Sequence, residues 1–210
     1  MSRMITCLYD DYDAALETAR DLEASGVPTG DISMIANNAD DRYAAASPSE
    51  TGAHAGTAAG VGTVLGGGVG LLAGLGMLAV PGIGPVVGLG WLAATAMGAV
   101  TGAAVGAATG GIIGSLTEAG VPEADAHVYA EGVRRGGTLL SVRAPNGLAQ
   151  GVEAILHRHN PVDIDLRGET YRNAGWTAFD EAAPPYELAD IERERALYGA
   201  PMASPTTLGR

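Results

Sequence analysis

The chain of 210 residues contains no lysine: its 12 basic residues are all arginine, against 24 acidic residues, for a formal net charge of -12. The absence of lysine excludes a P-loop lysine, a pyridoxal-phosphate Schiff base and a kinase-type ATP lysine. The excess of negative charge argues against binding along nucleic-acid phosphates. The single cysteine, Cys7, excludes a disulfide framework and a thiolate zinc site. The composition therefore indicates no particular reaction.

Charged residues are also missing from the whole middle of the chain. Residues 51–117 contain no Asp, Glu or Arg, and they hold 20 of the 32 glycines. Two stretches, residues 56–80 and 90–116, are long enough for apolar helices that cross a bilayer, because each would measure roughly 37 to 41 Å at about 1.5 Å per residue. Two prolines and two glycines between Val80 and Pro85 would end one helix and begin the next. We therefore expect a glycine-rich apolar helical hairpin.

Small residues recur every four positions in this segment, which is typical of helices that pack closely in lipid. An interior glycine costs a helix about 1 kcal/mol relative to alanine, so close backbone approach must offset that loss. A row of period four winds about 40° per step around a helix, so it should contact both the other arm and a neighbouring subunit. We predict self-association through Gly90, Ala94, Gly98, Gly102, Gly106, Gly110 and Gly114 in the second arm, and through Gly62, Gly66, Gly70 and Gly74 in the first.

The composition of residues 51–117 favours insertion into a lipid bilayer, because the segment has no charged face to present to water. One alternative is a soluble homo-oligomeric assembly or small-ligand sensor in which the hairpin is the buried oligomer core, and another is a weakly ordered low-complexity segment. Three G-x-G-x-x-A matches begin at Gly68, Gly74 and Gly88. None of them has both a preceding strand and an acidic residue about 20 positions later, so we expect no dinucleotide cofactor.

The polar segments on either side, residues 1–50 and 118–168, form one interrupted domain. Residues 4–9, 32–36, 138–143 and 162–166 have the pattern of strands, and the last run alternates apolar and acidic side chains. Helices are expected over residues 12–25, with Ala15, Ala19 and Leu22 facing inward, from Pro122 to Val133, and after an Asn146 cap. This order predicts an α+β fold: a ferredoxin-like β-α-β-β-α-β domain interrupted by the helical hairpin.

Because both hairpin ends belong to one domain, they should lie on the same side of a membrane. The chain starts without the pattern of a signal peptide, and Arg42, Arg134 and Arg135 lie near the hairpin ends, in agreement with the positive-inside tendency. We expect the polar domain on the cytoplasmic side of the cytoplasmic membrane, with a cytoplasmic assembly as the alternative.

Several runs of residues resemble a bacterial family. Ile5-Thr-Cys-Leu-Tyr-Asp10, Gly26-Val-Pro28, residues 31–36 and the glycine-rich middle are similar to general stress protein 17M-like (heat-induced stress) domains, and residues 119–139 strengthen the similarity. The resemblance covers about residues 4–143. It implies a stress-associated bacterial protein, often with a membrane-type segment, and it assigns no catalytic or binding residue.

Few side chains are candidates for chemistry. His157 and His159 could bind a metal with Asp163 or Asp165, but His and Arg near a helix end more commonly interact with its carbonyl groups. Cys7 is expected to be a small buried apolar group and His54 an interfacial residue, although a redox thiol and a pH sensor are the alternatives. We predict a non-enzymatic protein without metal or cofactor.

The C-terminal segment, residues 169–210, carries large aromatic side chains in polar surroundings. Such side chains usually dock on a surface, so we predict that Trp176, Phe179 and Tyr186 contact either the protein's own sheet or a neighbouring subunit. A short helix over residues 187–198 follows, with Leu188, Ile191 and Tyr198 on one side.

Overall fold

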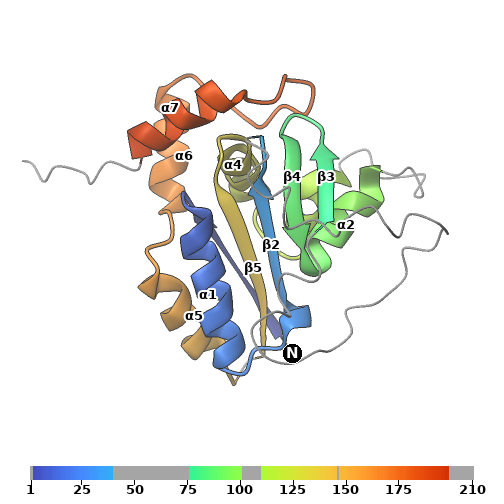
Figure 1. The fold of residues 1–210 in the computed structure, drawn as a ribbon, viewed down its shortest axis with the longest axis vertical. Coiled ribbons are helices and arrows are strands. Elements are labelled where there is room, and N and C mark those ends of the chain that lie inside the picture. The colour runs from blue at the N-terminus through green and yellow to red at the C-terminus, as the bar shows by residue number, and fades with distance from the viewer. Residues whose placement is uncertain (1, 40–75, 101–109, 146, 199–210) are drawn as a thin grey trace, which may run out of the picture.

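The computed structural model of the chain describes residues 2–39, 76–100, 110–145 and 147–198. These residues form an α+β fold around one antiparallel sheet of five strands (Figure 1). The strand order is β1-β5-β2-β4-β3. The strands are β1 (Ser2–Tyr9), β2 (Ile32–Asn37), β3 (Gly76–Val80), β4 (Gly84–Leu89) and β5 (Thr138–Pro145).

Helices cover both faces of the sheet (Figure 1). On one face lie α1 (Tyr12–Ala24) and α5 (Ala149–Arg158), whose buried side chains join those of β2 and β5 in a first core cluster. On the other face lie α2 (Gly90–Val100), the short α3 (Ser115–Glu118) and α4 (Glu123–Arg134), which share a second cluster with Leu8, Ile35 and Leu139. The C-terminal helices α6 (Ile164–Asn173) and α7 (Leu188–Tyr198) pack around α4.

The alternation of side chains along the strands explains this division. In β5, Leu140 and Val142 belong to the first cluster, whereas Leu139 belongs to the second. Successive residues of a strand point to opposite faces, so a strand that is apolar at consecutive positions must be covered on both sides. β2 is likewise buried along its whole length, which places it, with β5, in the middle of the sheet.

Most elements of the polar domain are confirmed. The expected strands over residues 4–9, 32–36 and 138–143 are β1, β2 and β5, and the helices over residues 12–25 and 187–198 are α1 and α7. Ala15, Ala19 and Leu22 are fully buried on α1, as their spacing predicts. α4 begins after Pro122 and ends at Arg134. α5 begins at Ala149, after Leu148, while the expected Asn146 cap lies outside the described residues.

The ferredoxin-like strand order is not confirmed, and the strand predicted over residues 162–166 is wrong. Ile164 begins α6, because the Asp163 carboxylate accepts a hydrogen bond from the Leu166 amide at 3.0 Å and so caps the helix. Alternating apolar and acidic residues therefore form a helix start here. The Val162 amide donates to the Leu8 carbonyl at 2.8 Å and the Tyr129 hydroxyl donates to the Thr6 carbonyl at 3.0 Å, so the outer edge of β1 is partly covered.

The predicted helical hairpin is wrong over residues 76–89 and is confirmed in part over residues 90–116. Residues 76–80, expected at the end of the first helix, form β3, and residues 81–83 connect β3 to β4 instead of joining two helices. β4 pairs with β2, with Met34 opposite Leu89, so this part of the apolar segment extends the sheet. The expected helix over residues 90–116 is α2 up to Val100, and Gly111 has non-helical backbone angles in the π-helical turn Gly110–Gly114 that leads to α3. Residues 56–75 and 101–109 lie outside the described residues.

Candidate functional site

Five of the eleven predicted self-association residues fall in the described structure: Gly90, Ala94 and Gly98 on α2, and Gly110 and Gly114 in the π-helical turn. The other six, Gly62, Gly66, Gly70, Gly74, Gly102 and Gly106, lie outside the described residues. The described part of the predicted small-residue row therefore lies on α2 and in the turn before α3.

Contacts within the chain require glycine at position 90. Its backbone has φ +82°, and a Cβ built there would collide with the Ile32 carbonyl oxygen and lie 2.8 Å from the Ser33 Cα of β2. The Ser33 hydroxyl donates to the Leu89 carbonyl at 2.8 Å and accepts from the Leu92 amide at 3.2 Å. This hydroxyl thus satisfies one of the free amides at the start of α2 and fixes the helix to the sheet.

α2 has one buried side and one exposed side. Leu92 and Ala93 are buried beneath it, whereas Ala94 and Thr95 are exposed. Gly98 follows Ala94 by four positions and therefore lies on the same side of the helix as Ala94. Of the predicted self-association residues on α2, Ala94 is therefore the one whose described side chain is exposed.

The C-terminal segment crosses α4 and the β3–β4 turn. Phe179 is buried in the second core cluster, and Trp176 is half-buried with its ring edge-to-face with Tyr171, the centroids 5.7 Å apart. At the turn, a Cβ on Gly82 would lie 2.7 Å from the Asp180 carbonyl oxygen, so only glycine permits this approach. The structure therefore places Trp176 and Phe179 on the protein's own helices and turn.

Two arginines at the end of α4 hold the same segment. Arg134 donates to the Pro184 carbonyl at 2.9 Å, and its guanidinium lies 4.8 Å from the centre of the Tyr186 ring. Arg135 donates to the buried Glu131 at 2.7 Å, bridges to Glu194 of α7 at 3.2 Å and lies 4.2 Å from the Tyr171 ring centre. The sequence indicated a membrane-side role for these arginines, whereas in the structure they bind the C-terminal segment.

The electrostatics of this contact follow from burial and paired charge. Burial acts to lower the pKa of Arg135, but the hydrogen bond to Glu131 and the charges of Glu131 and Glu194 outweigh burial and raise it. Burial raises the pKa of the Tyr171 hydroxyl, although the neighbouring arginines oppose this. The segment therefore docks with a charged guanidinium and a neutral phenol.

A second attachment ties α6 to the N-terminal half. Arg167 forms a bidentate pair with Asp10, both N to O distances being 2.8 Å, and its guanidinium lies 3.8 Å from the centre of the Tyr198 ring. Bidentate arginine–carboxylate pairs fix orientation as well as distance. The loop after β1 and the end of α7 are thus joined through one side chain.

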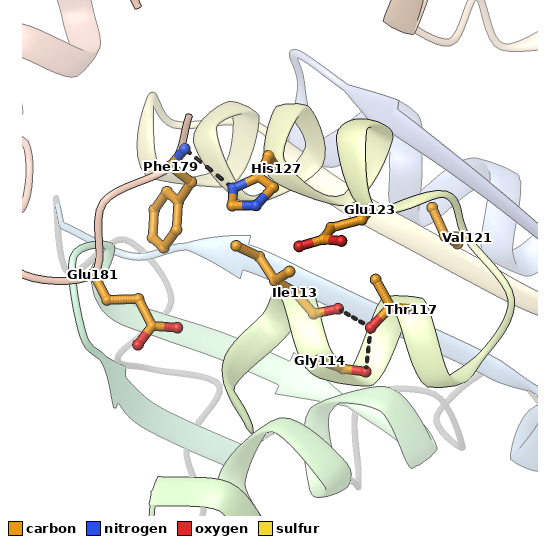
Figure 2. A pocket seen from close by; sticks show the side chains of 8 residues that line it. All are labelled: Ile113, Gly114, Thr117, Val121, Glu123, His127, Phe179 and Glu181. Atoms are coloured by element: carbon orange, nitrogen blue, oxygen red, sulfur yellow. Dashed lines mark hydrogen bonds between the residues drawn. The ribbon is translucent and has the colours of Figure 1, made fainter. Parts of the chain in front are cut away.

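A partly open cavity of about 500 Å³ lies where three segments meet (Figure 2). Ile113, Gly114 and Thr117 come from the end of the apolar segment, Val121, Glu123 and His127 from α4 and the loop before it, and Phe179 and Glu181 from the C-terminal segment. The Phe179 amide donates to His127 Nδ1 at 3.3 Å, which joins two of the walls. Sequence reasoning missed this cavity; the spacing of Glu123 and His127, four apart on one helix face, was the available signal.

The surroundings of His159 and Cys7, two further predicted candidates, indicate structural roles. His159 lies 3.0 Å from Asp21, which also pairs with the exposed Arg158 at 3.4 Å. Among the described residues, no group of three or more His, Cys, Asp or Glu side chains is arranged to hold a metal ion. Burial raises the pKa of the Cys7 thiol to about 11, which disfavours the thiolate. His54 lies outside the described residues.

Within the described ranges, none of the helices is both long enough and apolar enough to cross a bilayer. Comparisons of the chain with models of protein families, with curated proteins and with solved structures find no match.

Proposed function

We propose that this chain is a non-enzymatic, stress-associated bacterial protein that self-associates through its glycine-rich segment. The observation that carries the proposal is the two-sided character of α2. Leu92 and Ala93 are buried in the protein's own core, whereas Ala94 is exposed on the side that also holds Gly98. A small-residue surface on an exposed helix side allows a second helix to approach nearly backbone to backbone.

The stress association rests on the resemblance to general stress protein 17M-like domains. The non-enzymatic role rests on the same resemblance, which brings no catalytic residue onto this chain. The acidic charge of -12 fits a protein that contacts itself through an uncharged segment, because the charged residues all lie outside residues 51–117. Charge repulsion between polar domains would then limit growth of the assembly.

For location, we propose the cytoplasmic membrane with the polar domain on the cytoplasmic side. The absence of charged residues from residues 51–75, the part of the uncharged segment that precedes β3, supports this location, since a charged side chain within a bilayer is costly.

A soluble assembly is the second candidate, and the placement of β3 and β4 favours it. β2 and β3 both pair with β4, so the chain leaves and re-enters one sheet between Asn37 and Gly76. Two bilayer spans need about 40 residues, and 38 residues separate these two ends. In this candidate the glycine-rich segment is buried between protein subunits.

Ala94→Leu tests the self-association. We expect a smaller particle by light scattering, because the leucine side chain would hold the helices apart and remove dispersion contacts on both sides. The exposed helical Ala154 of α5 provides the matched control, since Ala154→Leu adds the same side chain away from α2. An Ala94→Leu protein with the parent's particle mass would refute association through this face.

Fractionation of expressing cells separates the two locations. Membrane association predicts that most of the protein sediments with membranes, resists carbonate extraction and requires detergent for release. A soluble assembly predicts a large particle in the detergent-free supernatant. The second result would refute the membrane location and leave the self-association proposal standing.

A further inference from the structure

The cavity between α3, α4 and the C-terminal segment has the dimensions of a ligand site. Its volume of about 500 Å³ falls in the usual range for small-molecule pockets, roughly 300 to 1,000 Å³. Three of the side chains that line it are apolar: Ile113, Val121 and Phe179. A ligand with a short hydrocarbon body would bury that body against these side chains.

The polar groups of the cavity are mostly hydrogen-bond acceptors. The Thr117 hydroxyl donates its single proton toward the Ile113 carbonyl at 3.1 Å and the Gly114 carbonyl at 3.0 Å, so its lone pairs remain for a ligand. The carboxylates of Glu123 and Glu181 form no ion pair or hydrogen bond within the described part of the chain, and both side chains are exposed to the cavity (Figure 2). An ionised carboxylate accepts hydrogen bonds and donates none.

His127 supplies a single donor. Its Nδ1 accepts from the Phe179 amide at 3.3 Å, so the proton of the neutral ring is on Nε2, which faces the cavity (Figure 2). Arginine is missing from the cavity lining, and the chain contains no lysine. The cavity thus presents two negative charges, several acceptors and no fixed positive charge.

We propose that this cavity binds a small organic cation, preferentially an aliphatic diamine. The carboxylates of Glu123 and Glu181 lie on either side of Ile113 and both face the cavity (Figure 2). One ammonium group pairs with each carboxylate, and the methylene chain lies along Ile113 and Phe179. An ammonium group has three donors and no acceptor, which complements the lining.

A ligand in this position would join the three segments that form the walls. Glu181 belongs to the C-terminal segment and lies close to Gly111, where a Cβ would be 3.1 Å from its Oε1. Glu123 belongs to the first turn of α4. Binding would therefore stabilise the docked C-terminal segment by mass action, because the site exists only when that segment is docked.

Isothermal titration of the full-length protein with butane-1,4-diamine tests the proposal, at constant ionic strength and neutral pH. We expect saturable binding of the diamine, weaker binding of butylamine and no binding of butane-1,4-diol, which has the same body without charge. Glu123→Gln and Glu181→Gln should each weaken diamine binding about tenfold, the effect of losing one charge-assisted hydrogen bond.

Glu187→Gln and Glu192→Gln are the matched controls, since both glutamates are exposed, lie outside the cavity and change the net charge equally. We expect these variants to bind the diamine within about twofold of the parent. If diamine affinity falls equally in the cavity variants and in the control variants, the diamine is attracted by the overall negative charge of the protein, and the proposal is overturned. Absence of saturable diamine binding, equal binding of the diol, or displacement of the diamine by calcium ions at equal ionic strength would overturn it too. The proposal goes beyond self-association, and Ala94→Leu should leave diamine binding unchanged.

Discussion

Arg135→Ala should lower the free energy of unfolding by about 2 to 3 kcal/mol, because it removes a charge-assisted hydrogen bond to a buried carboxylate that keeps only its second, more distant arginine. The Arg135 Nε lies 2.7 Å from the Glu131 carboxylate, and the Glu131 side chain is only 1% exposed. After truncation, the described partner left to Glu131 is Arg134, at the longer distance of 3.4 Å. The contact of the guanidinium with the Tyr171 ring at 4.2 Å would be lost as well, which contributes roughly 1 to 2 kcal/mol.

Urea unfolding, followed by tryptophan fluorescence and circular dichroism, measures this cost. Arg158→Ala is the control, because Arg158 pairs with Asp21 at the surface and its loss should cost less than about 1 kcal/mol. Adding Glu131→Gln to Arg135→Ala should restore part of the stability, since it removes a buried charge that has lost the nearer of its two arginines. An Arg135→Ala protein as stable as the Arg158→Ala protein would refute the role given to this buried pair.

Three further predictions concern single positions. Gly90→Ala should destabilise the protein by about 2 kcal/mol or more, because φ is +82° at this position and β2 leaves no space for a Cβ. Gly151→Ala should stabilise the protein by about 1 kcal/mol, because Gly151 lies on α5 with open space around it. Thermal unfolding of both variants tests this difference in sign. Cys7 should react with a disulfide reagent at mildly alkaline pH at least about tenfold more slowly than free cysteine. Burial raises its pKa from 9.0 to about 11, and the greater nucleophilicity of the remaining thiolate offsets about half of this effect. A rate equal to that of free cysteine would contradict this burial. Burial raises the pKa of Tyr9 from 10.0 to about 12. The neutral phenol therefore contributes stability that is complete below pH 10.0 and is lost as the pH rises to about 12. Across this range, the free energy of unfolding measured in urea should fall by about 1.4 kcal/mol per pH unit because of this group.

Local patterns predicted the elements whose side chains have a strong period. α1 is an example, since Ala15, Ala19 and Leu22 recur at helical spacing and Gly26 follows with φ +95°. β5 is another, because Leu139, Leu140 and Val142 supply apolar side chains to both faces of a strand that is buried on both sides. In both cases the spacing of apolar side chains that favours the helix or strand lies within the element itself, so the sequence of that element is enough to predict it.

The candidate site was less accessible to sequence reasoning. Trp176 and Phe179 were singled out as docking residues, but the surface on which Phe179 docks, the turn at Gly82, lies about 100 positions earlier in the chain. The cavity combines Thr117, Glu123 and Glu181 from three segments, and no short motif contains all three. Residues brought together by packing leave no local spacing to recognise.

The α+β class, the boundaries of the uncharged segment and most elements of the polar domain follow from the amino-acid sequence. The conformation of residues 76–89 does not, because these residues are rich in Gly, Val and Pro and match neither the helical nor the strand period strongly. These residues form strands because β2 offers an edge with which β4 pairs, from Met34 opposite Leu89 to Asn37 opposite Val86. Strand preference depends on the neighbouring strand and on burial, so the partner that decided this conformation lies about 50 positions earlier in the chain.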